Sequence, residues 1–365
     1  MPNGYSLGVK QHIREIAKSA TPQYKVEPYG ALASLLTAHS QGVIKNDSYN
    51  GHKKTVIVKS KKRFTPAQTR TSRSCSNTAT SAYSEKEVLV DQVRQIAIHV
   101  EDEHIALFDD YASATKDAGA VRLMDEHMDT VMTAASALLQ SVNTDIVTLL
   151  AANVGVNRVT TNNTAQNINI ALNTTNNPLA NGINKILSDF AANQMSGRPI
   201  VVGAGLFHNW MLNQNAKGID QSGVMSRIQA AGFDLFVDYT VGTELAANNI
   251  LVYEKDAVHL VEYLEYQGFK AGVKPGASQF GVMTLPGDLG GGQLVPVKFD
   301  FQLRYNDCAE EFEYVDGSGA VTLEKGYNLI LTKQFGVDFI EDDAYRSGDV
   351  LEGNRGSLLF NITNT

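Results

Sequence analysis

The densest group of side chains that could hold a metal ion comprises His99, Glu101, Asp102, Glu103 and His104. Glu101 and His104 have the E-x-x-H spacing that places two ligands on one helix face in di-iron bundles. Such a bundle needs a second copy of the motif on another helix. Met124-Asp125-Glu126-His127 does not supply it, because no acid stands three residues before His127. We therefore interpret the stretch as a solvated acidic face and expect no metal site.

Motifs for nucleotide binding and catalysis are equally incomplete. Gly203-Ala204-Gly205 resembles the start of a phosphate-binding turn, but His208 replaces the third glycine of G-x-G-x-x-G. Asp256, His259 and Glu262 could form a catalytic trio, although a single histidine beside a strand is more often structural. No G-x-S-x-G, H-E-x-x-H or Cys-His signature is present. We expect no enzymatic activity and no cofactor.

The composition indicates a globular chain that needs no disulfide bond or metal ion for its stability. It has 365 residues, of which 43% are hydrophobic and 19% are charged, enough for one large domain or two lobes. Cys75 and Cys308 have no C-x-x-C spacing, so we expect neither a zinc knuckle nor a disulfide framework in a reducing compartment. No apolar signal region follows Met1 and no apolar run reaches 18 residues. We therefore expect neither export by a signal peptide nor insertion in a membrane.

The charge is unevenly divided along the chain. Lys and Arg number 31 against 39 Asp and Glu, a formal net charge of −8. Residues 1–84 contain 13 basic and 3 acidic residues, whereas residues 85–365 contain 18 basic and 36 acidic residues. An acidic main body argues against DNA or RNA as its specific partner.

Eight basic residues and no acid lie between positions 53 and 73. The pattern Thr55 to Val58 predicts a strand, but the segment after it has too few apolar residues to fold onto a core. We predict a long projecting hairpin or loop. Phe64 is its only aromatic residue, so base stacking on a single strand is disfavoured, while contact with phosphate remains open. The basic residues are Lys53, Lys54, Lys59, Lys61, Lys62, Arg63, Arg70 and Arg73.

An acidic counterpart occurs in the same chain. Residues 85–129 hold 12 acids against 4 bases. A projecting loop cannot conveniently fold onto its own root, but it can lie on the acidic region of a neighbouring copy, where opposite potentials set the register. We expect the contacts there to be made by Glu101, Asp102, Glu103, Asp109, Asp110, Asp125, Glu126 and Asp129.

A long helix is predicted over about residues 120–153. Its apolar residues follow steps of three and four along one stripe, and at 1.5 Å per residue the helix would span roughly 50 Å. The region before it is ambiguous: Ser84 and Glu87 form a capping-box pattern, yet the apolar residues from Val88 to Phe108 fit helix or strand. The stripe consists of Val121, Met124, Met128, Val131, Ala135, Leu138 and Val142.

The other predicted elements form an α/β lobe and a mostly β region. Short helices are expected at 31–36 and 183–195, and an Asn/Thr-rich surface insertion with a small strand at 157–181. In the lobe we expect strands at 200–203, 233–239, 250–253 and 260–264 and helices at 206–213 and 224–231. In the β region we expect strands at 295–303 and 327–337, a hairpin at 312–323 and a Gly-rich loop at 286–292.

This order of parts resembles the major capsid protein of tailed bacteriophages, the HK97-like fold shared with encapsulins. The resemblance covers most of the chain and rests on layout more than on signature residues. It implies an α+β HK97-like capsid fold with an N-arm, an extended loop, a peripheral domain with a long spine helix and an α/β axial domain. The implied boundaries are N-arm 1–50, extended loop 51–83, peripheral domain 84–197 and 271–365, and axial domain 198–270.

The resemblance implies a structural role: self-assembly of pentamers and hexamers into an icosahedral shell around double-stranded DNA, located in the virion. An encapsulin-like compartment and a soluble oligomeric enzyme remain as alternatives. Many family members begin with a scaffolding segment that is later removed. This chain enters the arm directly from Met1, so we expect a separate scaffolding protein, together with a portal. Packaged DNA would be touched only weakly and non-specifically, and no residue pair stands out for the covalent cross-link that some members form.

Overall fold

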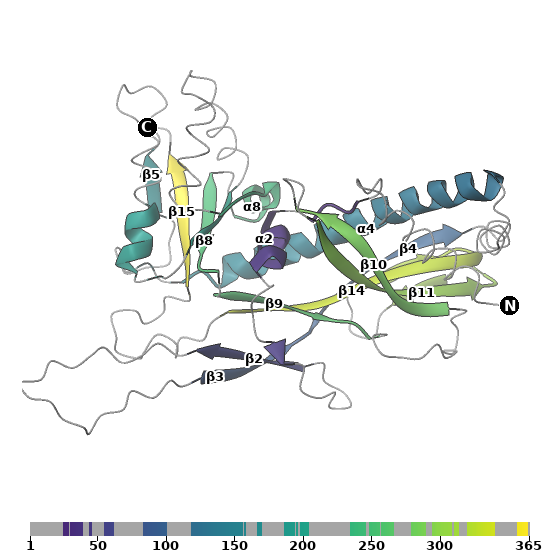
Figure 1. Cartoon of the computed structure of the whole chain (residues 1–365), viewed down its shortest axis with the longest axis horizontal. Helices are drawn as coiled ribbons and strands as arrows, with labels where there is room; N and C mark the ends of the chain where they lie inside the picture. The colour runs from purple at the N-terminus through teal and green to yellow at the C-terminus, as the bar shows by residue number, and fades with distance from the viewer. Residues whose placement is uncertain are drawn as a thin grey trace, which may run out of the picture. The chain divides into compact units, whose positions relative to one another are not determined.

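The computed structural model describes the chain in separate stretches that form two compact units. Unit 1 comprises Met1–Tyr29, Val90–Asn143 and Glu262–Gly336, and unit 2 comprises Gly30–Leu89, Thr144–Val261 and Val337–Thr365. The predicted α+β class with one long helix is confirmed (Figure 1). The described residues are 25–28, 30–38, 44–45, 55–61, 83–100, 118–155, 157, 166–169, 186–193, 195, 198–203, 234–245, 248–255, 257–265, 279–289, 294–308, 310–313, 320–339 and 356–363.

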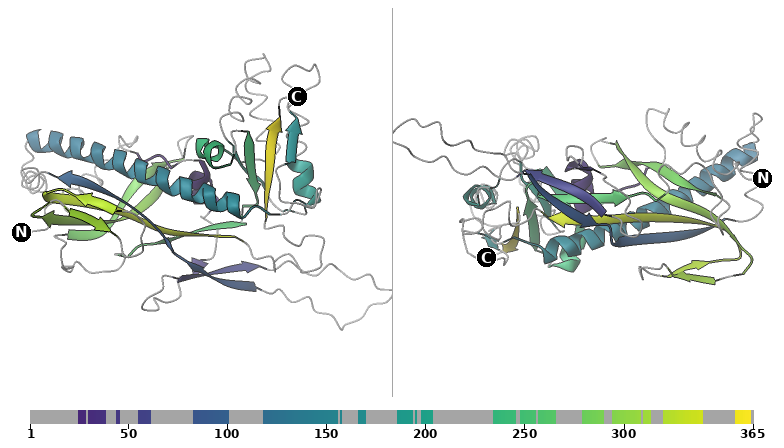
Figure 2. Two further views of the ribbon diagram at one scale, coloured as in Figure 1. Left: turned by 180° about the vertical axis from the view of Figure 1, so that it is seen from behind. Right: turned by 90° about the horizontal axis from the view of Figure 1, so that it is seen from below.

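The long helix, α4, runs unbroken from Ala118 to Ala152 (Figure 2). Its 35 residues correspond to about 52 Å at 1.5 Å per residue. The predicted stripe is confirmed from the third turn onward, where Met128, Val131, Ala135, Leu138 and Val142 are buried. The part from Asp125 to Ala152 is long and apolar enough to cross a membrane by length and composition alone. The buried stripe accounts for that hydropathy, because a core helix has the same composition.

The main sheet of unit 1 has five strands, four of them long and antiparallel; the fifth, β9 (Val258–Tyr263), pairs with the third strand of the order given next, β14. The four long strands are β10 (Gln279–Asp288), β11 (Leu294–Asn306), β14 (Gly326–Phe339) and β4 (Gln92–Val100), and they are hydrogen-bonded in the order β10-β11-β14-β4. Figure 1 shows β10, β11 and β14 side by side.

The period-two pattern predicted for β11 is confirmed. Val297, Phe299, Phe301 and Leu303 are buried, as expected for alternate residues of a strand that covers a core. β14 contributes Leu329, Leu331 and Phe335 to the buried set. These side chains form the apolar centre of the sheet.

One prediction about this sheet was wrong. The Gly-rich loop begins only after Asp288, because Pro286, Gly287 and Asp288 continue strand β10 opposite β11. Gly287 suits the strand because a Cβ there would lie 2.6 Å from Val297 Cγ2.

The region after Ser84, which fitted helix or strand, begins as strand. Residues 83–89 form strand β3 (Tyr83–Leu89), and β4 follows at Gln92. The β-branched valines of this region favour strand. Pairing of β3 with residues 55–61 and of β4 with β14 outweighs the local capping pattern.

A short hairpin of unit 1 packs against the same sheet. β12 (Glu310–Glu313) and β13 (Ala320–Leu323) pair antiparallel, as predicted. Val321 and Leu323 are buried against Ile330, and Ala97 lies partly buried beside them.

Unit 2 contains a mixed five-stranded sheet in the order β5-β15-β8-β6-β7. β6 (Ile200–Gly203), β7 (Asp234–Val237) and β8 (Asn249–Tyr253) confirm the predicted strands, although β7 ends before the short helix α8 (Tyr239–Glu244). β9 (Val258–Tyr263) follows β8. The predicted small strand of the Asn/Thr-rich tract is β5 (Gln166–Asn169), and β15 (Ser357–Thr363) joins it to β8. β5 and β15 come from ranges that the resemblance assigned to the peripheral domain.

The N-terminal segment is anchored by specific contacts. In unit 1, Val26 forms a parallel β-bridge to Gly287. Lys25 forms an ion pair with Asp288, with 3.0 Å between Nζ and Oδ2. In unit 2, helix α2 (Gly30–Ala38) includes the predicted helix at 31–36, and its residues Ala31, Leu32 and Leu35 are buried. Residues 186–192 are helical, within the predicted helix at 183–195. The helices predicted at 206–213 and 224–231 lie outside the described residues.

Candidate assembly interface

The strands on either side of the predicted basic loop belong to a small three-stranded sheet in unit 2. β2 (Thr55–Lys61) pairs antiparallel with β3 over its whole length, and β1 (Ile44–Lys45) pairs with β2 on the other side. The strands of this sheet pair with one another and with neither five-stranded sheet. The strand predicted at residues 55–58 is thus confirmed as part of β2, and its partner strand begins at Tyr83.

The register of this hairpin defines the loop. The last pair is Lys61 with Tyr83, so residues 62–82 connect the two strands. That connection contains 21 residues, four of them basic and none acidic. Hairpin connections are commonly two to five residues long, and connections beyond about 15 residues are uncommon and usually functional.

Acidic residues of β3, which the predicted loop boundary left out, oppose the lysines of β2. Lys59 pairs with Glu85, and Ile57 with Glu87. By register, Lys59, Lys61, Glu85 and Glu87 occupy positions on one face of the sheet. The root of the hairpin therefore has mixed charge, and the excess positive charge belongs to the connection.

On the acidic side of the predicted interface, the structure describes three residues. Asp125, Glu126 and Asp129 lie within one turn and a half of α4, where Glu126 and Asp129 are exposed and Asp125 is half-buried. Asp125 and Asp129 stand four residues apart on a helix, an arrangement in which like charges are mildly destabilising. A cation placed beside them by a partner would relieve that repulsion.

The remaining predicted interface residues lie outside the described stretches. They are Lys53, Lys54, Lys62, Arg63, Arg70 and Arg73 on the basic side, and Glu101, Asp102, Glu103, Asp109 and Asp110 on the acidic side.

The β12–β13 hairpin contains further acidic residues that the predicted interface did not include. Strand β12 contains Glu310, Glu311 and Glu313, and Glu324 follows β13. The Glu324 side chain is 69% exposed and lies 3.9 Å from the His99 ring. The run E-E-F-E was the available signal, but it was interpreted only as a strand of a hairpin.

The catalytic and metal candidates are not assembled in the described part of the chain. No group of three His, Cys, Asp or Glu residues that could hold a metal occurs there. Of the possible trio, Asp256 lies outside the described residues, His259 is half-buried in β9, and Glu262 is engaged by a lysine. Gly203 is a buried residue of β6. Cys308 is exposed.

The lysine that engages Glu262 is almost fully buried. Lys333 of β14 is 2% exposed, and its Nζ lies 2.6 Å from Glu262 Oε1. The same Nζ donates a hydrogen bond to the Lys298 carbonyl at 2.9 Å and lies 5.4 Å from the centre of the Phe299 ring. Each of these contacts stabilises a cation. All three contacts are made to groups of the protein itself, so we interpret the arrangement as structural.

A second buried polar cluster belongs to unit 2. The hydroxyl groups of Tyr253 and Ser34 are hydrogen-bonded to each other. Burial raises the pKa of the Tyr253 phenol well above its usual value, and the nearby Asp238 carboxylate acts in the same direction, while the Ser34 hydrogen bond opposes them. Tyr253 therefore stays neutral at physiological pH and serves to hold α2 against β8.

Comparison with known proteins gives structural likeness without sequence likeness. No protein-family model matches the chain. No curated protein matches it in sequence. The chain is similar in structure to "Mycobacterium phage Cain", with 10% identity over 95% of this chain and 93% of that chain and a TM-score of 0.46.

Two of the similar structures are described as capsids. "Cyanophage A-1(L) capsid asymmetric unit" has 11% identity, covers 94% of each chain and gives a TM-score of 0.43. "The capsid of Myoviridae Phage XM1" has 8% identity, covers 96% of this chain and 98% of that chain, and gives a TM-score of 0.37.

Proposed function

We propose that this chain is the major capsid protein of a tailed bacteriophage, many copies of which assemble into an icosahedral shell around double-stranded DNA. The observation that carries the proposal is the 21-residue basic connection between β2 and β3. It starts from a sheet that does not pair with either main sheet. A monomeric protein gains little from such a segment, whereas a lattice of identical subunits can use it to join neighbours.

The charges of the two regions indicate which surfaces of neighbouring copies meet. The connection is basic, and the main body of the chain is acidic. When copies associate, the connection of one copy can lie on the acidic residues of the next, including Glu126 and Asp129 of α4. Exposed ion pairs add little free energy each, but complementary potentials speed encounter and set the register.

The order of the elements agrees with the layout that the resemblance implies. A hairpin, a long helix and a long-stranded sheet occur in the expected order along the chain, followed by a return to strands at the C-terminus. The assignment of residues 1–50, 51–83, 84–197 with 271–365, and 198–270 to the arm, loop, peripheral and axial domains is part of the proposal.

The same proposal defines the partners and the location. The chain would reside in the virion, with a separate scaffolding protein and a portal as assembly partners. The acidic body suits a container, because a wall that repels phosphate does not grip the packaged DNA. No catalytic step and no cofactor is assigned to it.

The decisive experiment reverses the charge of the connection. Changing its four basic residues, Lys62, Arg63, Arg70 and Arg73, to Glu should leave the chain folded by circular dichroism and stop the formation of shells seen by negative-stain microscopy. Normal shells from this variant would contradict the proposal. A matched control, Lys255→Glu with Lys325→Glu, changes bases elsewhere and should assemble normally.

A compensating variant tests the partner of the loop. Changing Asp125, Glu126 and Asp129 to Lys should also prevent assembly, and combining both sets of reversals in one chain should restore it, since the charges are again opposite.

The content of the purified particles distinguishes a capsid from an encapsulin-like compartment. Packaged DNA fits a capsid, whereas a protein cargo would identify an encapsulin-like compartment.

A further inference from the structure

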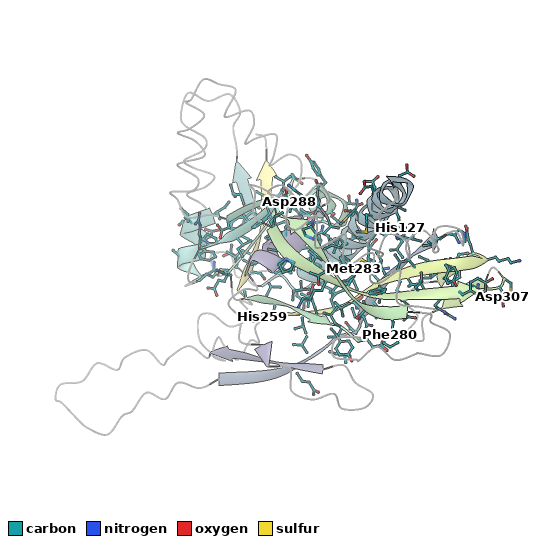
Figure 3. The ribbon with its side chains drawn as sticks, turned by 45° about the vertical axis from the view of Figure 1, so that its right-hand side comes forward. His127, His259, Phe280, Met283, Asp288 and Asp307 are labelled. Carbon is teal, nitrogen blue, oxygen red and sulfur yellow. The ribbon has the colours of Figure 1, made fainter. Side chains whose placement is uncertain are left out.

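Strand β15 is an interior strand of the sheet of unit 2, although it comes last of the described strands along the chain. It pairs parallel with β5 on one side and antiparallel with β8 on the other. In the strand order β5-β15-β8-β6-β7 it links β5 to the rest of the sheet. Figure 3 shows β15 in yellow beside β5 in teal. This sheet is therefore complete only when residues 357–363 are in place.

The side chains of β15 belong to the core of unit 2. Leu358 and Phe360 are 0% exposed. The neighbouring strand β8 pairs with β15 over its whole length, from Asn249 to Tyr253, and residues 250–253 are at most 2% exposed. Without β15, the backbone N–H and C=O groups along that side of β8 would lose their partners, which is costly for a strand so deeply buried.

The start of β15 is held by backbone geometry and two hydrogen bonds. Gly356, directly before the strand, has a φ of 69°, in the left-handed region that favours glycine. Its carbonyl accepts a hydrogen bond from the Glu254 N–H at 2.9 Å. The Ser357 hydroxyl accepts one from the Gly155 N–H at 3.0 Å. The entry into β15 therefore joins the turn after β8 to the segment after α4, both within unit 2.

The two large sheets need different lengths of the chain. The last strand of the main sheet of unit 1 along the chain is β14, which ends at Phe339. The sheet of unit 2 needs β15 as well. About 100 residues separate the end of β8 at Tyr253 from the start of β15 at Ser357, which corresponds to roughly 5–20 s of synthesis. All strands of the unit 1 sheet are thus synthesised before the strand that completes unit 2.

We propose that β15 is a folding checkpoint: the sheet of unit 2 stays unfinished between β5 and β8 until residues 356–363 arrive, whereas the main sheet of unit 1 forms without them. The checkpoint is a property of the single chain. For a chain that assembles into shells, it excludes copies that stop before residue 356, and this consequence alone rests on the proposed function.

A shortened chain tests the checkpoint. Hydrogen exchange followed by mass spectrometry compares unassembled full-length protein with a variant that ends at Arg355. Exchange in β8 should be roughly tenfold faster or more in the variant, because its protection depends on pairing with β15, and exchange in β11 should be unchanged. Unchanged exchange in β8 overturns the proposal. An equal acceleration in β11 also overturns it, since the two sheets would then open together.

A matched pair of substitutions makes the same test in the full chain. Gly356→Ala puts a side chain on a left-handed residue at the entry to β15 and should speed exchange in β8 about tenfold, with β14 unaffected. Gly326, the first residue of β14, has a φ of 115°, so Gly326→Ala should instead speed exchange in β14 and leave β8 unchanged.

Two results for Gly356→Ala contradict the checkpoint: exchange in β8 at the wild-type rate, or acceleration in β14 as large as in β8. The measurements use unassembled protein, so a failure to form shells would count against the proposed function and would leave these results unaffected.

Discussion

Lys333 shows how one side chain can decide the stability of a sheet. It stands in a strand whose neighbours are almost all buried, where an isolated ammonium group would be very costly. Glu262, the Lys298 carbonyl and the Phe299 ring offset that cost. The two side chains of the ion pair differ in exposure: that of Glu262 is 23% exposed and that of Lys333 only 2%.

This inequality predicts an asymmetric response to mutation. Glu262→Gln leaves a buried cation without its counter-ion and should lower the free energy of unfolding by about 3 kcal/mol. Lys333→Met keeps the volume, lets Glu262 turn to water and should cost less. The double variant should be more stable than Glu262→Gln alone. Urea denaturation of the three variants checks this order, and equal losses for both single variants would contradict it.

Tyr253 predicts a dependence of stability on alkaline pH. Burial raises its pKa in the folded chain well above the usual value of 10.0. The stability that it contributes is complete below pH 10 and is lost above it, because the unfolded chain releases the phenolic proton first. The loss approaches about 1.4 kcal/mol per pH unit.

Tyr253→Phe isolates this effect. The variant should lose about 1 kcal/mol at pH 7 with the Ser34 hydrogen bond, but its stability should fall less steeply than that of the wild type above pH 10. Chemical denaturation at several pH values measures the difference between the two proteins. Parallel pH curves would show that Tyr253 is not held neutral by burial.

At the scale of the elements, Asp238 joins two helices of unit 2. One carboxylate oxygen accepts from the Thr240 N–H and caps α8, and the other accepts from the Ala31 N–H at the start of α2, both at 2.9 Å. Gly30 allows this approach, because a Cβ at that position would lie 2.3 Å from the Asp238 Cβ. Helix α2 is therefore placed by a residue about 200 positions later in the chain.

Replacement of Asp238 tests this joint role. Asp238→Ala removes both acceptors and should cost about 2–3 kcal/mol, twice the loss of a typical cap. Asp238→Asn keeps one good acceptor and should cost roughly half as much. Thr243→Ala, on the exposed side of α8, is the control and should stay near the wild type. Thermal unfolding ranks the three, and an Asp238→Ala variant as stable as the control would contradict the double cap.

The helices and strands also show which parts of the fold local sequence patterns predict. The helix at 120–153 and the strand at 295–303 were predicted closely, since long runs with period 3.6 or period 2 have one stable solution. Pro286 misled, because a proline in a Gly-rich run suggests a loop, whereas strand pairing continues through it. After Ser84 the sequence left helix and strand open, and pairing with β2 decided for strand. The hairpin predicted at 312–323 is formed by β12 and β13.

At the scale of the whole molecule, the uneven charge predicts assembly that depends on salt. The screening length falls from about 10 Å at 0.1 M to about 3 Å at 1 M ionic strength. If the basic connection of one copy recognises acids of another, the yield of shells should fall steeply over that range. Light scattering during assembly measures it. Equal yields at low and molar salt would remove charge from the mechanism.

The sequence by itself determined the long helix, the main strands, the basic hairpin and the division between a basic segment and an acidic body. These properties depend on periodicity and composition, which are local. Only the tertiary structure decided that Lys333 is buried beside Glu262, that Asp238 caps α2, and that Val26 bridges Gly287 of β10. Each depends on residues brought together from distant parts of the chain, and no local pattern records which groups will meet.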